Sequence, residues 1–213
     1  MTDPYSNDQE LEQLKTWWKT YGNALLLGIA LGLSILMGNK YWSQHKQERA
    51  EAASAIYDGL VDNYREKAFD KLREASESLK GDYAATPYAG LAAMISARVN
   101  LVEGKIDDAR RELQWTLDNA TDDGTKHAAR LRLARIVADA NEVDAALFLL
   151  DVSDIAGFEL DYHELRGDLT VLKGDKQAAR EAYRMALKEL DEFSSYKSTL
   201  SMKLDALGPE ANE

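Results

Sequence analysis

The sequence predicts an all-α protein in which an N-terminal transmembrane helix is followed by an α-solenoid of about four helical hairpins. Three observations predict this fold. Residues 20–39 contain no charged side chain. The rest of the chain is dominated by strong helix formers, and only three prolines occur in 213 residues, so long stretches are free to be helical. Finally, a pattern of small and large apolar residues around a turn recurs three times along the chain.

The composition excludes several classes of function. The chain has 37 Asp and Glu against 26 Lys and Arg, which gives a formal net charge of −11. It therefore has no surplus of basic residues with which to bind nucleic-acid phosphates. It also has no cysteine, which excludes disulfides, thiolate metal sites and a cysteine nucleophile. With 45% hydrophobic and 30% charged residues, the balance is that of a globular protein.

The first element is a predicted membrane span at residues 20–42, which follows a short segment at residues 1–19. A helix of twenty uncharged residues is about 30 Å long, which matches the hydrocarbon core of a bilayer. Aromatic rings, which prefer the headgroup boundary, flank the run at Trp17, Trp18, Tyr21, Tyr41 and Trp42. The acidic start, the long apolar run and the missing small-residue cleavage site argue against a signal peptide. A buried helix of a soluble protein rarely needs such a run.

The orientation of the span is only weakly indicated by charge. Two lysines precede the run and three basic residues follow it closely, so the positive-inside rule slightly favours a cytoplasmic location for the large domain. Those residues are Lys15 and Lys19 before the run, and Lys40, Lys46 and Arg49 after it.

One face of the predicted span carries small residues. Ala24, Gly28 and Gly32 recur every four residues, so they share one side of the helix. Small side chains on such a face allow close approach of another membrane helix. We therefore predict a packing face for a membrane partner there. The alternative is ordinary glycine usage, because glycine is common in membrane helices.

Residues 43–208 are predicted to form the helical domain, with a short tail at residues 209–213. The repeated pattern centres on Gly104, Asn141 and Gly174, which are residue types that tolerate the left-handed conformation at a helix end. A small residue precedes each turn, and an alanine and then a larger apolar residue follow it. These residues are Ala97, Ala134 and Gly167, then Ala109, Ala146 and Ala179, then Leu113, Leu150 and Tyr183. The small residues let two helices approach closely, and such hairpins bury their apolar stripes by stacking. A plain bundle with coincidental spacing is the alternative.

A fourth, degenerate hairpin is predicted at the front of the domain. Ala68, Leu72 and Ala75 imitate a second helix, with Asn63 as the turn, but Ile56 stands where a small residue is expected. Terminal repeats often depart from the pattern because they cap the stack.

A stack of hairpins has a concave side that is lined by the first helix of each hairpin. The predicted groove residues are Met94, Arg98, Leu101, Leu131, Arg135, Asp161, Glu164 and Asp168. We predict that the arginines bind a carboxylate of a peptide, the acidic residues bind basic side chains, and the apolar residues bind apolar ones. The alternative is that these charges are solvated and paired within their own helices.

No catalytic, metal-binding or cofactor-binding residues are predicted. His45, His127 and His163 are far apart and match no metal-ligand spacing. The chain also lacks a phosphate-binding glycine loop and a Gly-x-Ser-x-Gly nucleophile motif. We therefore expect a protein that is not an enzyme and has no cofactor.

The repeated pattern resembles the tetratricopeptide repeat, most closely at residues 164–187. It lacks the tryptophan and tyrosine that are usual on the first helix, and the proline that often ends the second, where Thr121 and Asp191 stand instead. The resemblance implies a domain that is similar to the tetratricopeptide repeat (TPR) but departs from its strict consensus.

The whole chain also resembles the ancillary SecYEG translocon subunits, the YfgM-like proteins of bacterial inner membranes. The stretches that carry this resemblance are residues 10–19, Tyr21-Gly-Asn23, Tyr41-Trp-Ser-Gln-His45, Leu165-Arg-Gly-Asp168 and Met202-Lys-Leu-Asp-Ala-Leu207. The resemblance implies a cytoplasmic N-terminus, one inner-membrane span and a periplasmic TPR-like domain, an orientation that we prefer to the one from the charge count.

The same resemblance implies partners. These are the SecYEG translocon, a membrane-anchored periplasmic chaperone of the prolyl-isomerase-like type, and emerging secretory or outer-membrane proteins. The expected function is therefore a membrane-anchored interaction protein that links the translocon to chaperones and emerging chains. The alternative is a membrane-tethered regulatory adaptor that sequesters a signalling or stress-response protein.

Overall fold

The computed structural model describes the backbone of residues 4–209, and the side chains of residues 11–209 apart from residues 13, 24–26 and 29–30. Within this part of the chain the regular structure is entirely helical. The helices are α1 (Pro4–Arg65), α2 (Phe69–Asp82), α3 (Pro87–Val102), α4 (Ile106–Asn119), α5 (Asp123–Asp139), α6 (Val143–Leu149), α7 (Glu159–Lys173), α8 (Lys176–Lys188) and α9 (Tyr196–Asp205). The chain divides into two compact units, Met1–Glu51 and Ala52–Glu213.

The first unit is formed by the N-terminal part of α1. The uncharged run at residues 20–39 is helical throughout. Large apolar side chains of this run are exposed, for example Leu31 (63%) and Ile35 (69%). Residues 24–26 and 29–30 of the predicted span have side chains outside the described set. Among the residues that are described, no helix has both the length and the apolar character that crossing a membrane requires.

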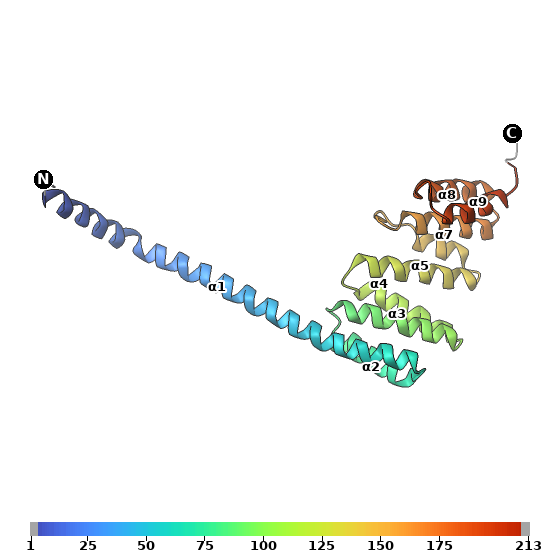
Figure 1. The fold of residues 1–213 in the computed structure, drawn as a ribbon, viewed down its shortest axis with the longest axis horizontal. Helices are drawn as coiled ribbons and strands as arrows, with labels where there is room; N and C mark the ends of the chain where they lie inside the picture. The colour runs from blue at the N-terminus through green and yellow to red at the C-terminus, as the bar shows by residue number, and fades with distance from the viewer. Residues whose placement is uncertain (1–3, 210–213) are drawn as a thin grey trace. The chain divides into compact units, whose positions relative to one another are not determined.

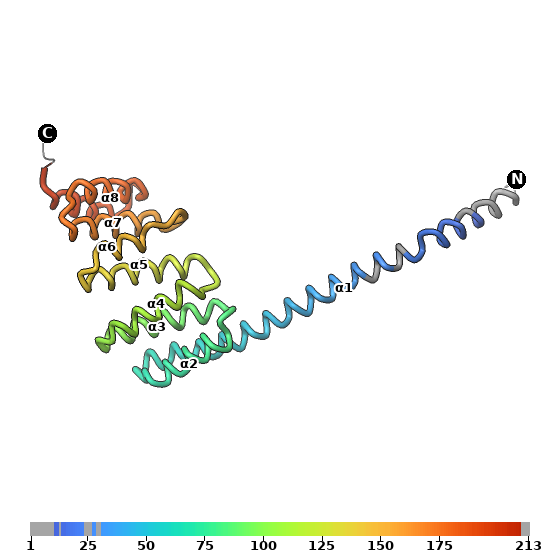
Figure 2. Tube along the Cα trace, turned by 180° about the vertical axis from the view of Figure 1, so that it is seen from behind, coloured from blue at the N-terminus to red at the C-terminus, as the bar shows by residue number. Residues whose placement is uncertain are grey.

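The second unit is a stack of helical hairpins. Each helix from α2 to α9 packs against the next one in the chain, and α3 also contacts α5, as α5 contacts α7. Figures 1 and 2 show this order from two sides, with α2 and α3 at one end and α8 at the other, where Figure 1 also shows α9. Contacts between the first helices of consecutive hairpins are what distinguish a solenoid from a set of independent pairs. The predicted solenoid is therefore confirmed.

The C-terminal part of α1 supplies the first helix of the front hairpin. Ala53 and Leu60 of α1 are fully buried and pack in one cluster with Leu72 and Leu79 of α2. The end of α1 thus forms a hairpin with α2, through this shared cluster. The further hairpins are α3 with α4, α5 with α6, and α7 with α8, and α9 packs on α8. This arrangement agrees with the expectation of about four hairpins.

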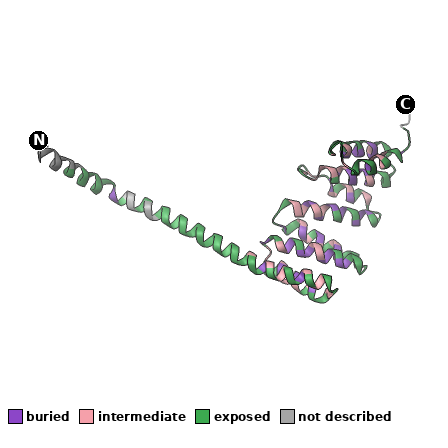
Figure 3. Ribbon diagram, in the orientation of Figure 1, coloured by how far each residue is buried: buried purple, intermediate pink, exposed green. Residues whose placement is uncertain are grey.

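The repeated pattern around the turns is confirmed residue by residue. Gly104, Asn141 and Gly174 have φ angles of 75°, 66° and 83°, which is the left-handed conformation predicted for them. The small residues, the alanines and the larger apolar residues of the pattern are all buried. Figure 3 shows buried residues on α2 to α8 where these helices face one another. The pattern therefore marks the interfaces between helices.

The predicted turn at Asn63 is wrong, because α1 continues to Arg65 and the left-handed residue is Lys67, with φ of 60°. The backbone shows that Lys67 is the equivalent position. At every one of these four turns, the residue after the left-handed one donates its backbone N–H to the carbonyl of the residue that lies four positions before the left-handed residue. The pairs are Ala68 to Asn63 (2.9 Å), Lys105 to Asn100 (2.8 Å), Glu142 to Val137 (3.2 Å) and Asp175 to Thr170 (2.9 Å). This bond is typical of helix C-termini that end in a left-handed residue.

Packing explains why the front turn departs from residue preference. Counted from Lys67, the positions of the small residue and the alanine are occupied by Leu60 and Leu72, and both are fully buried. Contacts between these leucines fix where the two helices end, and they outweigh the weak preference of asparagine for a turn.

Candidate functional site

The predicted groove residues lie on the first helices of three consecutive hairpins. Met94, Arg98 and Leu101 are on α3, Leu131 and Arg135 are on α5, and Asp161, Glu164 and Asp168 are on α7. The structure places most of them in two groups of different charge: a pocket with arginines on α3 and α5, and a cluster of carboxylates on α7.

The first group lines a pocket of about 380 Å³ between α3 and α5, which we call the arginine pocket. It brings together four of the predicted groove residues, namely Met94, Arg98, Leu101 and Arg135. Arg132, Ile136 and Asp139 of α5 line it as well. The pocket thus combines three guanidinium groups and one carboxylate with an apolar lining, a combination that suits a polypeptide ligand.

Arg132 was missed by the sequence analysis, which considered only a few offsets from each turn. It lies three residues before Arg135, a spacing that places two side chains on the same helix face, and this signal was available in the sequence. Its guanidinium Nη1 is 3.7 Å from the sulfur of Met94 across the pocket.

Arg98 is oriented by a residue from outside the three predicted helices. Its Nε donates a hydrogen bond to the hydroxyl of Tyr64 in α1, at 3.0 Å. This bond fixes one edge of the guanidinium group, and the two terminal nitrogens make no recorded bond within the described part of the chain. A guanidinium that is held in this way is available for bidentate binding of a carboxylate.

Charge within the arginine pocket is unbalanced, because three arginines share it with a single aspartate. Among the described residues, no ion pair joins Arg98, Arg132 or Arg135 to a carboxylate. Partial burial, together with the like charges of Arg135 and Arg98, lowers the pKa of Arg132. An arginine remains protonated at physiological pH even so. The lowered pKa therefore means that the positive charge of Arg132 is destabilised in the free protein and would be stabilised by an anion.

Two predicted residues lie elsewhere. Leu131 is only 4% exposed and packs in the central core cluster with residues such as Tyr162, so it does not line the arginine pocket. Asp161 is exposed at the start of α7.

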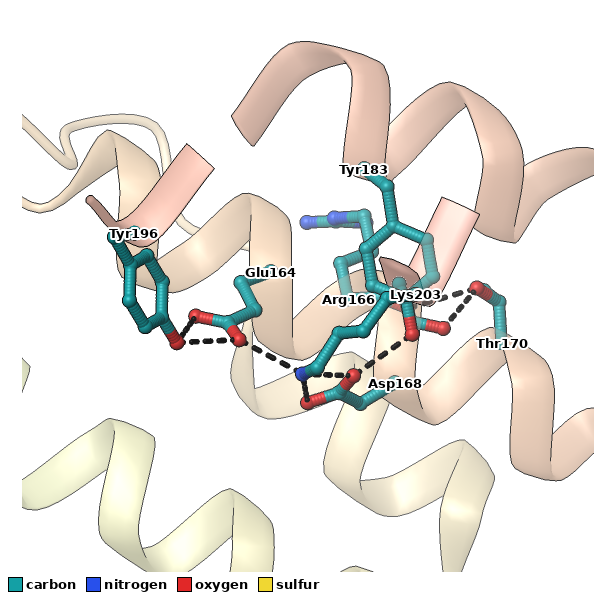
Figure 4. A network of polar contacts seen from close by, with 8 residues as sticks. Glu164, Arg166, Asp168, Thr170, Tyr183, Tyr196 and Lys203 are labelled. Carbon is teal, nitrogen blue, oxygen red and sulfur yellow. Dashed lines mark hydrogen bonds and ion pairs between the residues drawn. The ribbon is translucent and has the colours of Figure 1, made fainter. Parts of the chain in front are cut away.

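Two residues of α9, Tyr196 and Lys203, reach the acidic cluster formed by Glu164 and Asp168 of α7, as Figure 4 shows. The Nζ of Lys203 lies 2.7 Å from Glu164 Oε1, and 2.7 and 2.9 Å from the two carboxylate oxygens of Asp168. The hydroxyl of Tyr196 donates to Glu164 at 2.7 Å, and that of Tyr183 donates to Asp168 at 2.8 Å. Two predicted acceptors for the basic residues of a partner thus already bind a lysine of the same chain.

Burial and charge shift the pKa values in this cluster. Burial and the hydrogen bond to Asp168 raise the pKa of Tyr183 well above its usual range. The hydrogen bond to Glu164 raises the pKa of Tyr196. Burial alone would lower the pKa of Lys203, but its hydrogen bonds to Asp168 and Glu164 raise it overall. The cluster is therefore most stable with both tyrosines neutral and the lysine charged.

The histidines are not gathered into a site within the described residues. The Nδ1 of His127 is 2.9 Å from the Tyr162 hydroxyl, and its ring packs 5.0 Å from that of Phe158, in the interior of the unit. In the part of the chain that the structure describes, no group of three or more His, Cys, Asp or Glu residues is arranged to hold a metal ion.

Two residues of the predicted packing face are described. Gly28 and Gly32 are exposed on α1, and a Cβ atom at either position would meet no heavy atom within 4 Å. The side chain of Ala24, the third residue of this face, lies outside the described set. Nothing within the described chain thus occupies the space beside the two glycines.

The chain is similar to known proteins that contain helical repeats. Residues 15–209 match the family described as "Tetratricopeptide repeat-like domain". A protein of Escherichia coli (strain K12) named "Ancillary SecYEG translocon subunit" is 32% identical over 201 residues, which cover 94% of this chain and 96% of that protein. Proteins with the same name are 29% identical in Neisseria gonorrhoeae and 28% identical in Haemophilus influenzae, over 93% and 84% of this chain and 96% and 87% of those proteins.

Proposed function

The chain belongs to the tetratricopeptide repeat-like family and, within it, to the ancillary SecYEG translocon subunits, and from this premise we propose that it is a non-enzymatic protein that binds other polypeptides beside the SecYEG translocon. The structural observation that carries the proposal is the solenoid with the arginine pocket between α3 and α5. Tetratricopeptide-like hairpins stack to form extended concave surfaces, and such surfaces bind other proteins.

We further propose the membrane arrangement predicted from the sequence. In this arrangement residues 1–19 are cytoplasmic, residues 20–42 cross the inner membrane, residues 43–208 form the periplasmic domain, and residues 209–213 are its tail. The uncharged run with aromatic residues at both ends supports the span, as does the exposure of Leu31, Ile35 and Met37 along α1. In water such a row of exposed side chains is unfavourable, whereas in a bilayer it is solvated.

The proposed partners are the translocon, a membrane-anchored periplasmic chaperone of the prolyl-isomerase-like type, and emerging secreted chains. A tether to the same membrane confines the domain close to these partners and raises their effective concentration. Binding in the groove can then be weak and still be productive, which suits a protein that must release chains as they emerge.

Topology is the first test. A periplasm-dependent reporter enzyme fused after Glu213 should be active, and a cytoplasm-dependent reporter at the same position should be inactive. A signal from the cytoplasmic reporter alone would contradict the proposed arrangement, and with it any role on the periplasmic side of the translocon.

The groove is the second test. We expect the double variant Arg98→Glu with Arg135→Glu to lose most of its co-purification with chaperones and emerging chains from solubilised membranes, because it places negative charge in the arginine pocket. Arg65→Glu with Arg111→Glu is the control, since these two arginines are exposed and pair with an aspartate on their own helix. Equal co-purification by both double variants, with native helical content, would remove the groove from the proposed function.

A further inference from the structure

The arginine pocket carries positive charge on a chain that is otherwise acidic. The formal net charge is −11, yet Arg98, Arg132 and Arg135 line one pocket and have no ion-pair partner among the described residues. Elsewhere on the same unit, basic side chains do pair with carboxylates across helices, as Lys80 does with Glu112 and Arg110 with Glu142. The absence of such partners in this pocket needs a reason, because three like charges repel one another.

The lining beside these charges is apolar. Met94 and Leu101 of α3 and Ile136 of α5 line the same pocket of about 380 Å³, and Leu101 is more than one-third exposed. An inorganic anion would gain nothing from these side chains. A ligand that uses the whole pocket therefore has both carboxylates and at least one large apolar group.

We propose that the arginine pocket selects acidic segments of polypeptide, in which two or more Asp or Glu side chains stand beside a large apolar side chain. This inference rests on the proposed function and adds the chemical class of its ligand. The carboxylates bind Arg98, Arg132 and Arg135, and the apolar side chain packs on Met94, Leu101 and Ile136. Asp139, which is the one carboxylate of the lining, repels an acidic segment, but the three arginines outnumber it and leave the pocket with net positive charge.

Two observations favour side-chain carboxylates of an internal segment over a single terminal carboxylate. Three guanidinium groups that are not neutralised exceed what one carboxylate can pair with, since a bidentate pair uses one guanidinium for one carboxylate. Within the described residues the terminal nitrogens of Arg98 make no hydrogen bond, so Arg98 adds a third guanidinium group to the two of α5. The charge of the pocket thus matches a run of acidic residues.

The other charged group on the groove-forming helices reinforces this selectivity. Glu164 and Asp168 already bind Lys203, so a basic segment must displace that lysine in order to use them. At the arginine pocket no described carboxylate forms an ion pair with an arginine, so an acidic segment has no such pair to break. Segments that carry carboxylates are therefore the ones that the free protein is ready to bind.

The experiment measures binding of short fluorescent peptides to the full-length protein in detergent, by fluorescence anisotropy. One peptide has two aspartates beside a leucine and has both ends blocked. A second has asparagines in place of the aspartates, and a third has no acidic side chain but a free C-terminal carboxylate. We expect the first peptide to bind at least about tenfold more tightly than the other two, and its affinity to fall as the salt concentration rises.

Matched variants locate the site. We expect Arg132→Gln to lower the affinity for the acidic peptide by about tenfold or more. The double variant Arg98→Gln with Arg135→Gln should lower this affinity further. Arg111→Gln is the control, because it removes the same charge from an exposed arginine of α4 that does not line this pocket. Circular dichroism checks that each variant keeps its helical content.

Three outcomes would overturn the proposal: equal binding of the aspartate and asparagine peptides, preference for the peptide with the free C-terminus, or no loss of affinity in the pocket variants. None of these outcomes affects co-purification with the translocon. A protein that still co-purifies but shows no preference for acidic peptides would therefore retain the proposed function and lose only this inference.

Discussion

At the scale of single residues, one contact shows why the last repeat needs a small side chain before its turn. A Cβ atom at Gly167 of α7 would clash with Cε1 of Tyr183 in α8. The ring of Tyr183 therefore occupies the space that glycine leaves. The same tyrosine donates to Asp168, which fixes the ring in place. The close approach of α7 and α8 therefore depends on this pair of one absent and one large side chain.

We expect Gly167→Ala to lower the free energy of unfolding by about 1–3 kcal/mol, because the ring of Tyr183 must move to admit a methyl group. Gly59→Ala is the matched control: Gly59 is helical, and a Cβ there meets no atom within 4 Å. Alanine is the better helix former, so the control should gain up to about 1 kcal/mol. Urea unfolding measures both, and a loss of similar size in the two variants would contradict the packing explanation.

The tyrosines of the acidic cluster predict how stability changes in base. The folded protein raises the pKa of Tyr183 and of Tyr196, whose usual value is 10.0. As the pH rises past that value, the unfolded chain loses these protons while the folded chain keeps them. The unfolded state then binds fewer protons, so stability decreases with rising pH. At pH values well below the usual tyrosine pKa, the stability contributed by these two tyrosines is fully retained.

We therefore expect the free energy of unfolding to fall between about pH 9 and pH 11, and to fall less steeply in Tyr183→Phe, which removes one of the two groups. The variant should lose about 1 kcal/mol at neutral pH with its hydrogen bond to Asp168. Tyr41→Phe serves as the control because Tyr41 is exposed on α1. Urea titrations across this range decide the matter, and parallel curves for Tyr183→Phe and the unchanged protein would contradict the assignment.

At the scale of helices and turns, the sequence alone predicts the parts of the fold in which one residue type is forced. Gly104 and Gly174 take the left-handed conformation that glycine adopts without a steric cost, and Asn141 tolerates it. The front turn is not predictable in this way, since Lys67 has no such preference. It becomes recognisable only from the hydrogen bond that the four turns share, between Ala68 and Asn63 in this case.

Lys67 should consequently be a site where stability is gained. A lysine with φ of 60° pays a steric cost that glycine avoids, so Lys67→Gly is expected to raise the free energy of unfolding by about 1 kcal/mol. Lys71→Gly, in the interior of α2, should instead lower it by about 1 kcal/mol. Thermal and urea unfolding of both variants test the pair, and destabilisation by Lys67→Gly would show that its side chain matters more than its backbone.

The candidate site was predictable to a similar extent. Offsets from the turns identify Arg98 and Arg135 as exposed residues of the first helices, because helix periodicity fixes the faces of α3 and α5. The offsets do not reveal which charges are paired. Lys203 reaches Glu164 and Asp168 from more than thirty residues away in the sequence, through the packing of α9. Such long-range pairing depends on the whole stack and leaves no local signal.

At the scale of the whole molecule, the chain joins two regions of opposite character. The uncharged run at residues 20–39 contrasts with a net charge of −11 for the complete chain. The negative charge favours solubility of the large domain, while the proposed span at the run would be solvated by a bilayer. A protein of this kind works where a membrane and an aqueous partner are close together, as the proposed place beside a translocon would provide. The two proposed contact surfaces, on the run and on the solenoid, should then be separable by mutation.

The small-residue face of the run gives the last prediction. We expect Gly28→Leu with Gly32→Leu to reduce site-specific crosslinking to a membrane partner severalfold, because leucine at both positions keeps another helix from approaching closely. Gly38→Leu is the matched control: it makes the same chemical change on another side of the same helix, where a Cβ also meets no described atom within 4 Å. Binding of an acidic peptide to the arginine pocket should be unchanged in all these variants. If crosslinking falls equally with Gly38→Leu, then Gly28 and Gly32 only reflect the general use of glycine in membrane helices. If crosslinking survives the double change, the small-residue face is not needed, and the partner is held by the solenoid alone.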